Sequence, residues 1–215
     1  TRVEIKGVPA ISRIGALTSY EAKRQKALLG LRNELHKRGF KPNDRPGNIT
    51  SLGLDSAHLS HPDLAAAKQV GDSIRAIVFP NAAGIFTWPL EGRTFADDVS
   101  GQVRVVACLD QLPNMLHTDG DVGGLNEKDR LLVTSKLNLS EDDVAVLVWG
   151  PEDDTNTAAE EIRDRFAQAL VAIPNETRQA LNNNRNDFER VLPGPDRMYP
   201  DTDSPPHEIT EDRVE

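Results

Sequence analysis

The chain has 215 residues, a formal net charge of −9 and a hydrophobic content of 38%. This length allows one or two domains with a substantial core, and no apolar run is long enough for a membrane helix. The first residues lack the apolar segment of a secretion signal, and they open directly on a strand-like pattern without Met. We therefore expect a cytoplasmic piece of a longer protein, with no membrane contact. The single cysteine excludes an internal disulfide and a cysteine-based zinc site.

The charge is distributed unevenly along the chain. Residues 1–48 contain eleven basic and four acidic residues, a net charge of +7, so the remainder carries −16. Such an asymmetry indicates two parts in different surroundings. Only the first part has a charge balance suited to nucleic acid, although a solvated helix face explains the same charges equally well.

The basic segment predicts a strand followed by a helix. Residues 3–6 alternate with period two, which is typical of a half-buried strand. The helix is predicted to start at Thr18, with Glu21 completing a capping box, and to end near Arg38. Its basic side chains are expected to lie largely off the buried stripe of Ala27, Leu28, Leu31 and Leu35; they are Lys23, Arg24, Lys26, Lys37 and Arg38.

The segment between residues 48 and 185 alternates helices with short strands. The expected strands are 49–54, 74–79, 115–117 and 144–150, and the expected helices are 62–70, one capped by Thr94 and Asp97, 126–137 and 157–173. The continuous apolar run of 144–150 indicates a central strand covered on both faces. Residues 175–181 have the appearance of a short helix or turns. The fold class predicted is α+β, with helices packed on one mixed or antiparallel sheet.

A proline-rich stretch, residues 192–206, holds five prolines and cannot form a helix interior or a central strand. It presents Arg197, Tyr199, Asp201 and Asp203 along a stiff, extended track. Two carboxylates that alternate along an extended chain are weak candidates for holding Mg²⁺. The plainer interpretation is a proline-rich exit from a domain, with solvated aspartates.

The chain contains no self-contained catalytic constellation. No glycine loop has the spacing of a dinucleotide site or a P-loop, and no nucleophile elbow is present. The five histidines include no pair at helical i,i+4 spacing, so we predict no metal site from them.

Two blocks carry a resemblance to a known family. Residues 3–8, Val-Glu-Ile-Lys-Gly-Val, and residues 20–25, Tyr-Glu-Ala-Lys-Arg-Gln, resemble a strand and helix of the GatB/GatE family of tRNA-dependent amidotransferase subunits. Residues 193–206 resemble the segment by which that family returns to its catalytic cradle, with Asp201 in place of the usual glutamate. The spacing between the blocks is similar to that of the archaeal-type branch, GatE. In that branch an inserted domain related to that of bacterial-type aspartyl-tRNA synthetase lies between them.

The resemblance implies a division into three parts. Residues 1–47 would be the end of the cradle, residues 48–190 an inserted GAD-type α+β domain, and residues 191–215 the proline-rich return to the cradle. Glu4, Lys6, Arg197 and Tyr199 are carried over as candidates that line the cradle. The candidates for tRNA contact are Lys23, Arg24, Lys37 and Arg38.

The resemblance also implies a reaction for the complete protein, a ligase of the amidotransferase class. The family converts Glu-tRNA(Gln) to Gln-tRNA(Gln): ATP with Mg²⁺ activates the glutamate, and ammonia arrives from a partner amidase that resembles an asparaginase. The family's Mg²⁺ ligands would precede Thr1, so this piece is expected to be inactive alone and to bind no cofactor. The alternatives are a non-catalytic module that docks protein or tRNA, and the insertion domain of an aspartyl-tRNA synthetase. The sequence leaves open which surface of the insert meets tRNA, the oligomeric state, and whether residues 1–45 fold alone.

Overall fold

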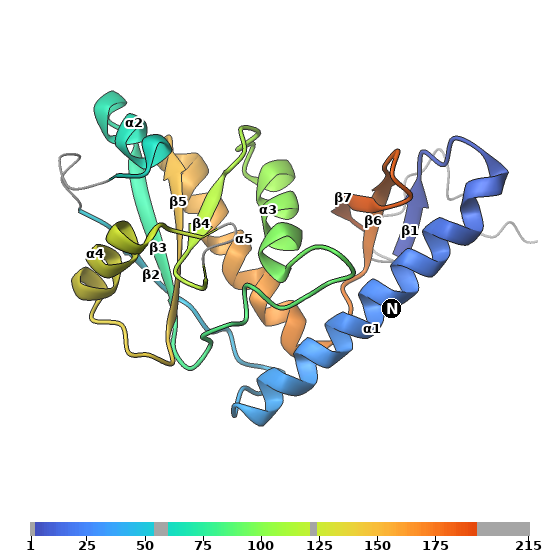
Figure 1. The fold of residues 1–215 in the computed structure, drawn as a ribbon, viewed down its shortest axis with the longest axis horizontal. Helices are drawn as coiled ribbons and strands as arrows, with labels where there is room; N and C mark the ends of the chain where they lie inside the picture. Colours follow the sequence, from blue (N-terminus) through green and yellow to red (C-terminus); the bar gives the residue numbers. More distant parts are fainter. Residues whose placement is uncertain (1–2, 54–59, 121–123, 193–215) are drawn as a thin grey trace, which may run out of the picture.

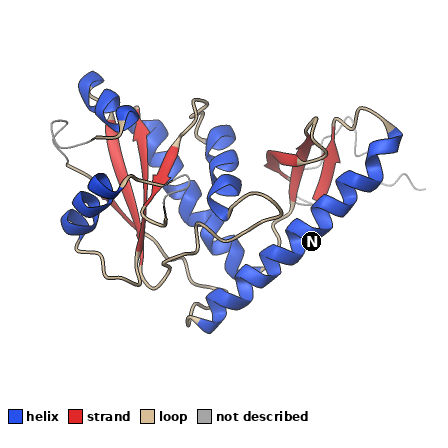
Figure 2. Cartoon of the chain, viewed as in Figure 1, coloured by secondary structure: helices blue, strands red, loops and turns tan. Residues whose placement is uncertain are grey.

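The computed structural model describes residues 3–53, 60–120 and 124–192 of the chain (Figure 1). In chain order the elements are β1 (Val3–Lys6), a 3-10 turn (Ile11–Arg13), α1 (Ile14–Lys37), β2 (Asn48–Ser51), α2 (Pro62–Val70), β3 (Ser73–Phe79), α3 (Phe95–Val106), β4 (Met115–His117), α4 (Glu127–Leu137), β5 (Val144–Gly150), α5 (Glu152–Val171), β6 (Glu176–Ala180) and β7 (Asn186–Val191). The helices and the two separate sheets confirm the α+β class (Figure 2).

The larger sheet, here called the core sheet, is antiparallel with the strand order β2-β3-β5-β4. Its strand β5 lies between two neighbours and is covered on both faces, as the apolar run predicts. Val144, Val146 and Val148 belong to the core shared with α1, α3 and α5. Ala145 and Leu147 belong to the core shared with α2 and α4. Figure 1 shows these two helix layers on opposite sides of the sheet.

The core between the core sheet and α5 is built from aromatic rings. Phe166 of α5 stacks on Phe79 of β3 with ring centroids 4.5 Å apart, and Phe86 and Phe95 lie within 6.4 Å of the Phe166 ring. Large rings packed in this way contribute more than their area alone. This cluster fixes α5, and with it the charged residues that α5 carries, against the core sheet.

The smaller sheet, here called the small sheet, has the strand order β1-β6-β7. Strand β1 pairs in parallel with β6, with Val3 opposite Glu176, and β6 pairs antiparallel with β7. The sequence interpretation of residues 175–181 as a short helix or turns is therefore wrong. Charged and polar residues fill β6, and for that reason the apolar alternation of a strand is absent from its sequence.

The division at residue 190 falls inside β7. The strand pairing joins residues 176–190 to the first segment of the chain, although the predicted division places them in the middle segment. The chain therefore forms β1 of the small sheet, continues through α1 and the whole core sheet, and adds the other two strands of the small sheet, β6 and β7, afterwards.

Helix α1 spans both sheets, as Figure 1 shows. Its C-terminal half packs Leu28, Leu31 and Leu35 into the core of the core sheet. Its N-terminal half buries Leu17 and Tyr20 beside the small sheet. The helix begins at Ile14 with no side-chain cap, so the predicted capping box at Thr18 is wrong. Continuing the buried stripe to Leu17 requires one more helical turn than that box allows.

Candidate functional site

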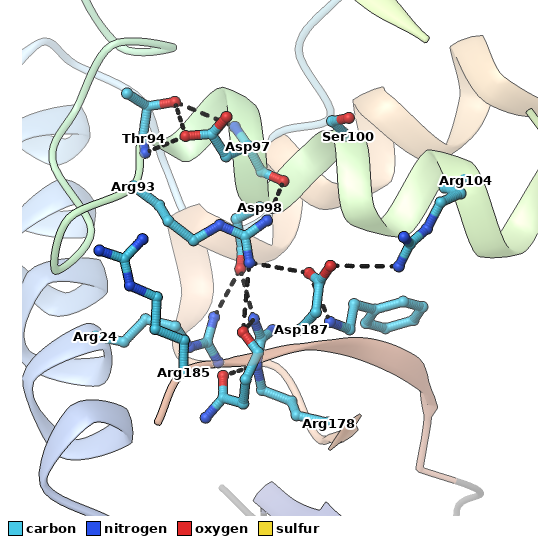
Figure 3. A network of polar contacts seen from close by, with 12 residues as sticks. Arg24, Arg93, Thr94, Asp97, Asp98, Ser100, Arg104, Arg178, Arg185 and Asp187 are labelled. Atoms are coloured by element: carbon cyan, nitrogen blue, oxygen red, sulfur yellow. Dashed lines mark hydrogen bonds and ion pairs between the residues drawn. The ribbon is translucent and has the colours of Figure 1, made fainter. Parts of the chain in front are cut away.

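A buried ionic cluster lies where the small sheet meets the helices of the core sheet. We call it the ionic junction, and define it by six charged side chains that are each 7% exposed or less: Glu21, Arg24, Asp98, Arg165, Glu176 and Arg178. They come from α1, α3, α5 and β6, so four elements that lie far apart in the sequence meet at one point. Figure 3 shows three of the six, Arg24, Asp98 and Arg178. Three arginines face three carboxylates, and the formal charge of the junction is balanced.

Asp98 is the centre of the ionic junction. One carboxylate oxygen accepts from Arg24 Nη1 at 3.0 Å and from Arg178 Nη2 at 3.2 Å. The other accepts from Arg165 Nη2 at 2.6 Å. A single carboxylate of α3 therefore holds arginines from α1, α5 and β6 together.

The remaining carboxylates complete the cluster around the arginines. Glu21 accepts from Arg24 Nε at 3.0 Å, and Glu176 accepts from Arg178 Nη1 at 2.9 Å. Asn186 of β7 accepts from Arg178 Nε at 2.6 Å and donates to Glu21 at 2.9 Å. The neutral amide links the two strands of the small sheet to α1.

Electrostatics keep the carboxyl groups of Asp98 and Glu21 ionised. Burial alone would raise the pKa of Asp98, but the adjacent guanidinium groups of Arg24, Arg178 and Arg165 outweigh burial and hold it well below its usual range. The pKa of Glu21 is likewise lowered, because the hydrogen bond and charge of Arg24 outweigh burial. A proton donor or acceptor near neutral pH needs a pKa near the working pH. The junction therefore serves as a scaffold that fixes geometry rather than as an acid–base centre.

An outer ring of half-buried ion pairs surrounds the junction. Asp187 of β7 accepts from Arg93 at 3.0 Å and from Arg104 at 3.3 Å. Figure 3 shows Asp187 between these two arginines. Gly101 allows this approach, since a Cβ at that position would lie 2.7 Å from an Asp187 carboxylate oxygen. The edge of the small sheet is thereby fastened to α3.

The expectation that Arg24 lies off the buried face of its helix is wrong. Its side chain is 1% exposed and fully engaged in the ionic junction. A contact with a large nucleic acid requires an exposed side chain, so Arg24 is no longer a candidate for tRNA contact. The other three candidates reach the surface: Lys37 is exposed, Lys23 is exposed and pairs with Glu91 at 3.0 Å, and Arg38 is half-buried.

The cradle candidates are only partly described. Glu4 is half-buried and Lys6 is exposed, both on β1. Arg197 and Tyr199 lie outside the described residues, as do the weak metal candidates Asp201 and Asp203. Strand β7, which ends just before them, lies in the same sheet as β1.

The donor sets within residues 3–53, 60–120 and 124–192 do not fit a metal centre. No group of three or more His, Cys, Asp or Glu side chains there is placed to hold an ion. The same part of the chain has no helix long and apolar enough to cross a membrane.

The sequence alone did not lead us to predict four members of the ionic junction: Asp98, Arg165, Glu176 and Arg178. A signal was present in the helices, because Asp98 follows Phe95 by three residues and Arg165 follows Ile162 by three, both on buried stripes. A charge at a core position of a helix indicates a buried partner. The β6 residues gave no comparable signal, because their strand was not predicted.

Comparisons with known proteins give relatives along nearly the whole chain, while no family model matches it. The chain is 33% identical over 98% of its length to the E subunit of the glutamyl-tRNA(Gln) amidotransferase of Pyrococcus abyssi. It is 34% identical over 98% of its length to the protein of that name in Methanopyrus kandleri. With its counterpart in Saccharolobus islandicus the identity is 33% over the full chain. The chain spans about a third of the length of these curated relatives.

Proposed function

The chain is homologous, over nearly its whole length, to one third of the E subunit of glutamyl-tRNA(Gln) amidotransferase, and on this premise we propose that it performs that segment's part in the same reaction. The identity of about 33% across 98% of the chain carries the proposal. It extends across β1, the middle segment and the small sheet, and is therefore not confined to one motif.

The reaction proposed for the complete protein is conversion of Glu-tRNA(Gln) to Gln-tRNA(Gln). ATP with Mg²⁺ would activate the glutamate side chain, and a partner amidase, the asparaginase-like component of the complex, would supply ammonia. Because the described residues offer no metal-binding group, we assign no step of the activation to them. In this proposal the chain holds its two sheets at a fixed angle and contacts tRNA.

In this proposal the small sheet belongs to the catalytic cradle, and the core sheet belongs to an inserted domain held out from it. The ionic junction and α1 support this division of roles, because together they fix the angle between the two sheets. An arm held at a fixed angle can position a bound tRNA relative to a reaction centre elsewhere in the complete protein, and positioning of this kind contributes to rate.

Residue roles follow from exposure. Glu4 and Lys6 on β1, with Arg197 and Tyr199, are proposed to line or support the cradle. Lys23, Lys37 and Arg38 are proposed to contact tRNA, since their side chains reach the surface. The middle segment is strongly acidic, so its own contact with tRNA would depend on shape more than on phosphate attraction.

A direct test is an amidation assay with the complete protein and its amidase partner. We expect conversion of Glu-tRNA(Gln) that depends on ATP and Mg²⁺, and no conversion by residues 1–215 alone. A complete protein that binds Glu-tRNA(Gln) together with the amidase but never amidates it would overturn the proposal.

In the same assay, Arg197→Ala should lower activity. The matched control is Arg190→Ala, which replaces an exposed arginine of β7. Unchanged activity and tRNA affinity in Arg197→Ala would remove that residue from the cradle.

A further inference from the structure

Two hollows meet at the loop between α3 and β4, residues 107–114. The first has a volume of about 330 Å³ and lies between this loop, α2 with the turn after it, the end of β5 and the start of α5. The second, of about 340 Å³, lies between the loop, the first turns of α3 and strand β4. Leu112 and Pro113 line both hollows, which together form one groove, here called the loop groove.

The walls of the loop groove are fixed before any ligand arrives. The side-chain amide of Asn114, which is 3% exposed, donates to the backbone oxygens of Ser100 at 3.0 Å and Leu109 at 3.1 Å. Its oxygen accepts from the Ser100 hydroxyl at 2.6 Å. The loop is thereby tied to α3, and a preformed site loses less free energy to ordering when a ligand binds.

The first hollow is acidic. Among the described residues, no lysine or arginine lines it, but four aspartates do: Asp63, Asp72, Asp110 and Asp154. Asp63 lies 3.7 Å from His61 Nδ1. The carboxylates of the other three make neither a hydrogen bond nor an ion pair within the described part of the chain. Like charges around one concavity focus a negative potential there, so the hollow favours a cation.

The same hollow has an aromatic and aliphatic wall. Trp149 of β5 is half-buried and lines it together with Leu109 and Leu112, which is 65% exposed. The face of an indole ring attracts a cation, and aliphatic side chains pack against the methylene stem of a lysine or arginine. No three acidic side chains of the described residues are placed to hold a metal ion. The hollow therefore suits an organic cation on an alkyl stem.

The second hollow combines apolar walls with one unpartnered polar side chain. Ala96 and Met115 line it beside the shared loop residues. Its hydroxyl and carboxylate groups already belong to the capping box of α3 or bond to Asn114. His117, which is 1% exposed, also lines it, and its Nδ1 is buried without a hydrogen-bond partner. Buried polar atoms normally have partners, so this hollow is incomplete without a ligand.

We propose that the loop groove binds an extended segment of a partner protein, with a basic side chain in the first hollow and an apolar side chain in the second. Charge complementarity selects this occupant, because the carboxylates attract a basic peptide and repel the phosphates of RNA. Alternate side chains of an extended segment point to the same side, so the motif is a basic and an apolar residue two positions apart. The backbone of the segment brings N–H and C=O groups, the kind of partner that His117 lacks.

The position of the loop groove separates it from the basic end of α1. Figure 1 shows the loop between α3 and β4 at one end of the core sheet and the C-terminal end of α1 at the other. The last turn of α1 carries the basic residues. A protein docked in the loop groove would therefore leave the surface proposed for tRNA contact open, and the inference does not depend on the proposed function.

The first experiment is an NMR titration of residues 1–215 with the peptide acetyl-Arg-Gly-Leu-amide at constant ionic strength. The indole N–H signals of the two tryptophans are the readout, assigned with Trp149→Phe. A saturable shift is expected for Trp149 and none for Trp88, whose indole donates to the Ala27 oxygen of α1. Acetyl-Glu-Gly-Leu-amide should cause no shift, and acetyl-Arg-Gly-Ser-amide should bind more weakly. Absence of a saturable Trp149 shift would overturn the proposal.

Two neighbouring aspartates of α5 provide a matched pair of variants. Asp154 lines the first hollow, whereas Asp153, one position earlier, is exposed and lies outside it. Asp154→Asn should weaken peptide binding by about fivefold. Asp153→Asn removes an equal charge from the same helical turn and should bind as the parent does. Circular dichroism checks that both are folded. Equal weakening in the two variants would reduce the effect to general negative charge and reject the site.

Two further measurements test the nature of the occupant. Spermidine carries cationic groups without an apolar side chain or a peptide backbone. If spermidine bound as tightly as the Arg-Gly-Leu peptide, and the Arg-Gly-Ser peptide did too, the groove would belong to a small cation. Sedimentation velocity tests a second copy of this chain as the occupant: monomers are expected for the parent and for Asp154→Asn. Self-association that Asp154→Asn abolishes would reject a separate partner protein.

Discussion

The two sheets of this protein are held by opposite means. The core sheet buries apolar side chains on both faces, with Val146 on one and Leu147 on the other. The small sheet is fastened through the ionic junction, where Asp98, Glu176 and Arg178 take the place of an apolar core. Apolar burial is non-directional and tolerates variation. A buried charge is satisfied only in one geometry, so the junction contributes a defined angle between the sheets.

Among these substitutions, Asp98→Ala should lower the free energy of unfolding most. In Asp98→Ala, three buried arginines lose their shared carboxylate, and breaking a buried ionic group in this way costs about 3–5 kcal/mol. Urea denaturation of residues 1–215 measures the loss. The neighbouring exposed carboxylate provides the control: Asp97→Ala removes one half of a capping box, at about 1 kcal/mol. If Asp98→Ala and Asp97→Ala lowered the free energy of unfolding by the same small amount, the ionic junction would not hold the small sheet in place.

A cavity in the core sheet should cost slightly less. Leu147 is fully buried between the sheet and the layer of α2 and α4, and a Leu→Ala substitution at such a site costs about 3 kcal/mol. The same urea series applies. Hydrogen exchange adds the contrast, because Leu147→Ala should lower protection in β5 and Asp98→Ala in β6. Equal loss in both strands for both variants would show that the two sheets unfold as one unit.

The stability of the protein should depend on pH in two steps, one from His117 and one from buried or hydrogen-bonded carboxylates. Burial lowers the pKa of His117 in β4, with the Asp119 charge opposing, so the unfolded chain binds a proton that the folded chain resists. Stability therefore falls as the pH drops below about 6.5, the ordinary value of histidine. Asp98 and Glu21 have lowered pKa values, so their contribution persists until the pH falls below about 4.

His117→Gln tests these two windows. In urea denaturation between pH 7.5 and 3, the parent chain should lose stability in two steps, one below about pH 6.5 and one below about pH 4. The variant should lose stability only in the second step. A variant that keeps the upper step would assign that step to another group.

The smallest effect is expected on the surface. Arg45 is half-exposed and pairs with Glu160 and Asp164 of α5. Exposed pairs of this kind contribute little, so Arg45→Gln should leave the urea midpoint unchanged within error. A clear loss would mean that surface pairs share in holding α5, and the contrast between the sheets would be weaker.

The strands of the core sheet could be predicted from the sequence, whereas of the small sheet only β1 could. Continuous apolar residues at 144–150 indicate a central strand, and Thr94 with Asp97 does form the predicted capping box. Strand β6 carries Glu176 and Arg178 inward, so no local pattern distinguishes it from a loop. Its partner β1 lies at the other end of the chain, and sequence patterns within a short window contain no information about such pairing.

Part of the candidate site was within reach of sequence reasoning. The Tyr-Glu-x-x-Arg-Gln block drew attention to the turn of α1 that holds Glu21 and Arg24, but Arg24 was placed on the wrong face. The error arose because basic residues were assumed to face water. The spacing of Leu17, Arg24, Leu28 and Leu31 in fact continues a single stripe.

The parallel pairing of β1 with β6 joins residues 173 positions apart, with Val3 opposite Glu176. The entropy of closing a loop grows only with the logarithm of its length, so each doubling adds only about 0.6 kcal/mol. Once the two strands are side by side, lengthening or shortening the excursion between them changes their meeting very little. Evolution could therefore enlarge, trim or replace the looped-out portion while the strands that anchor it stay in register.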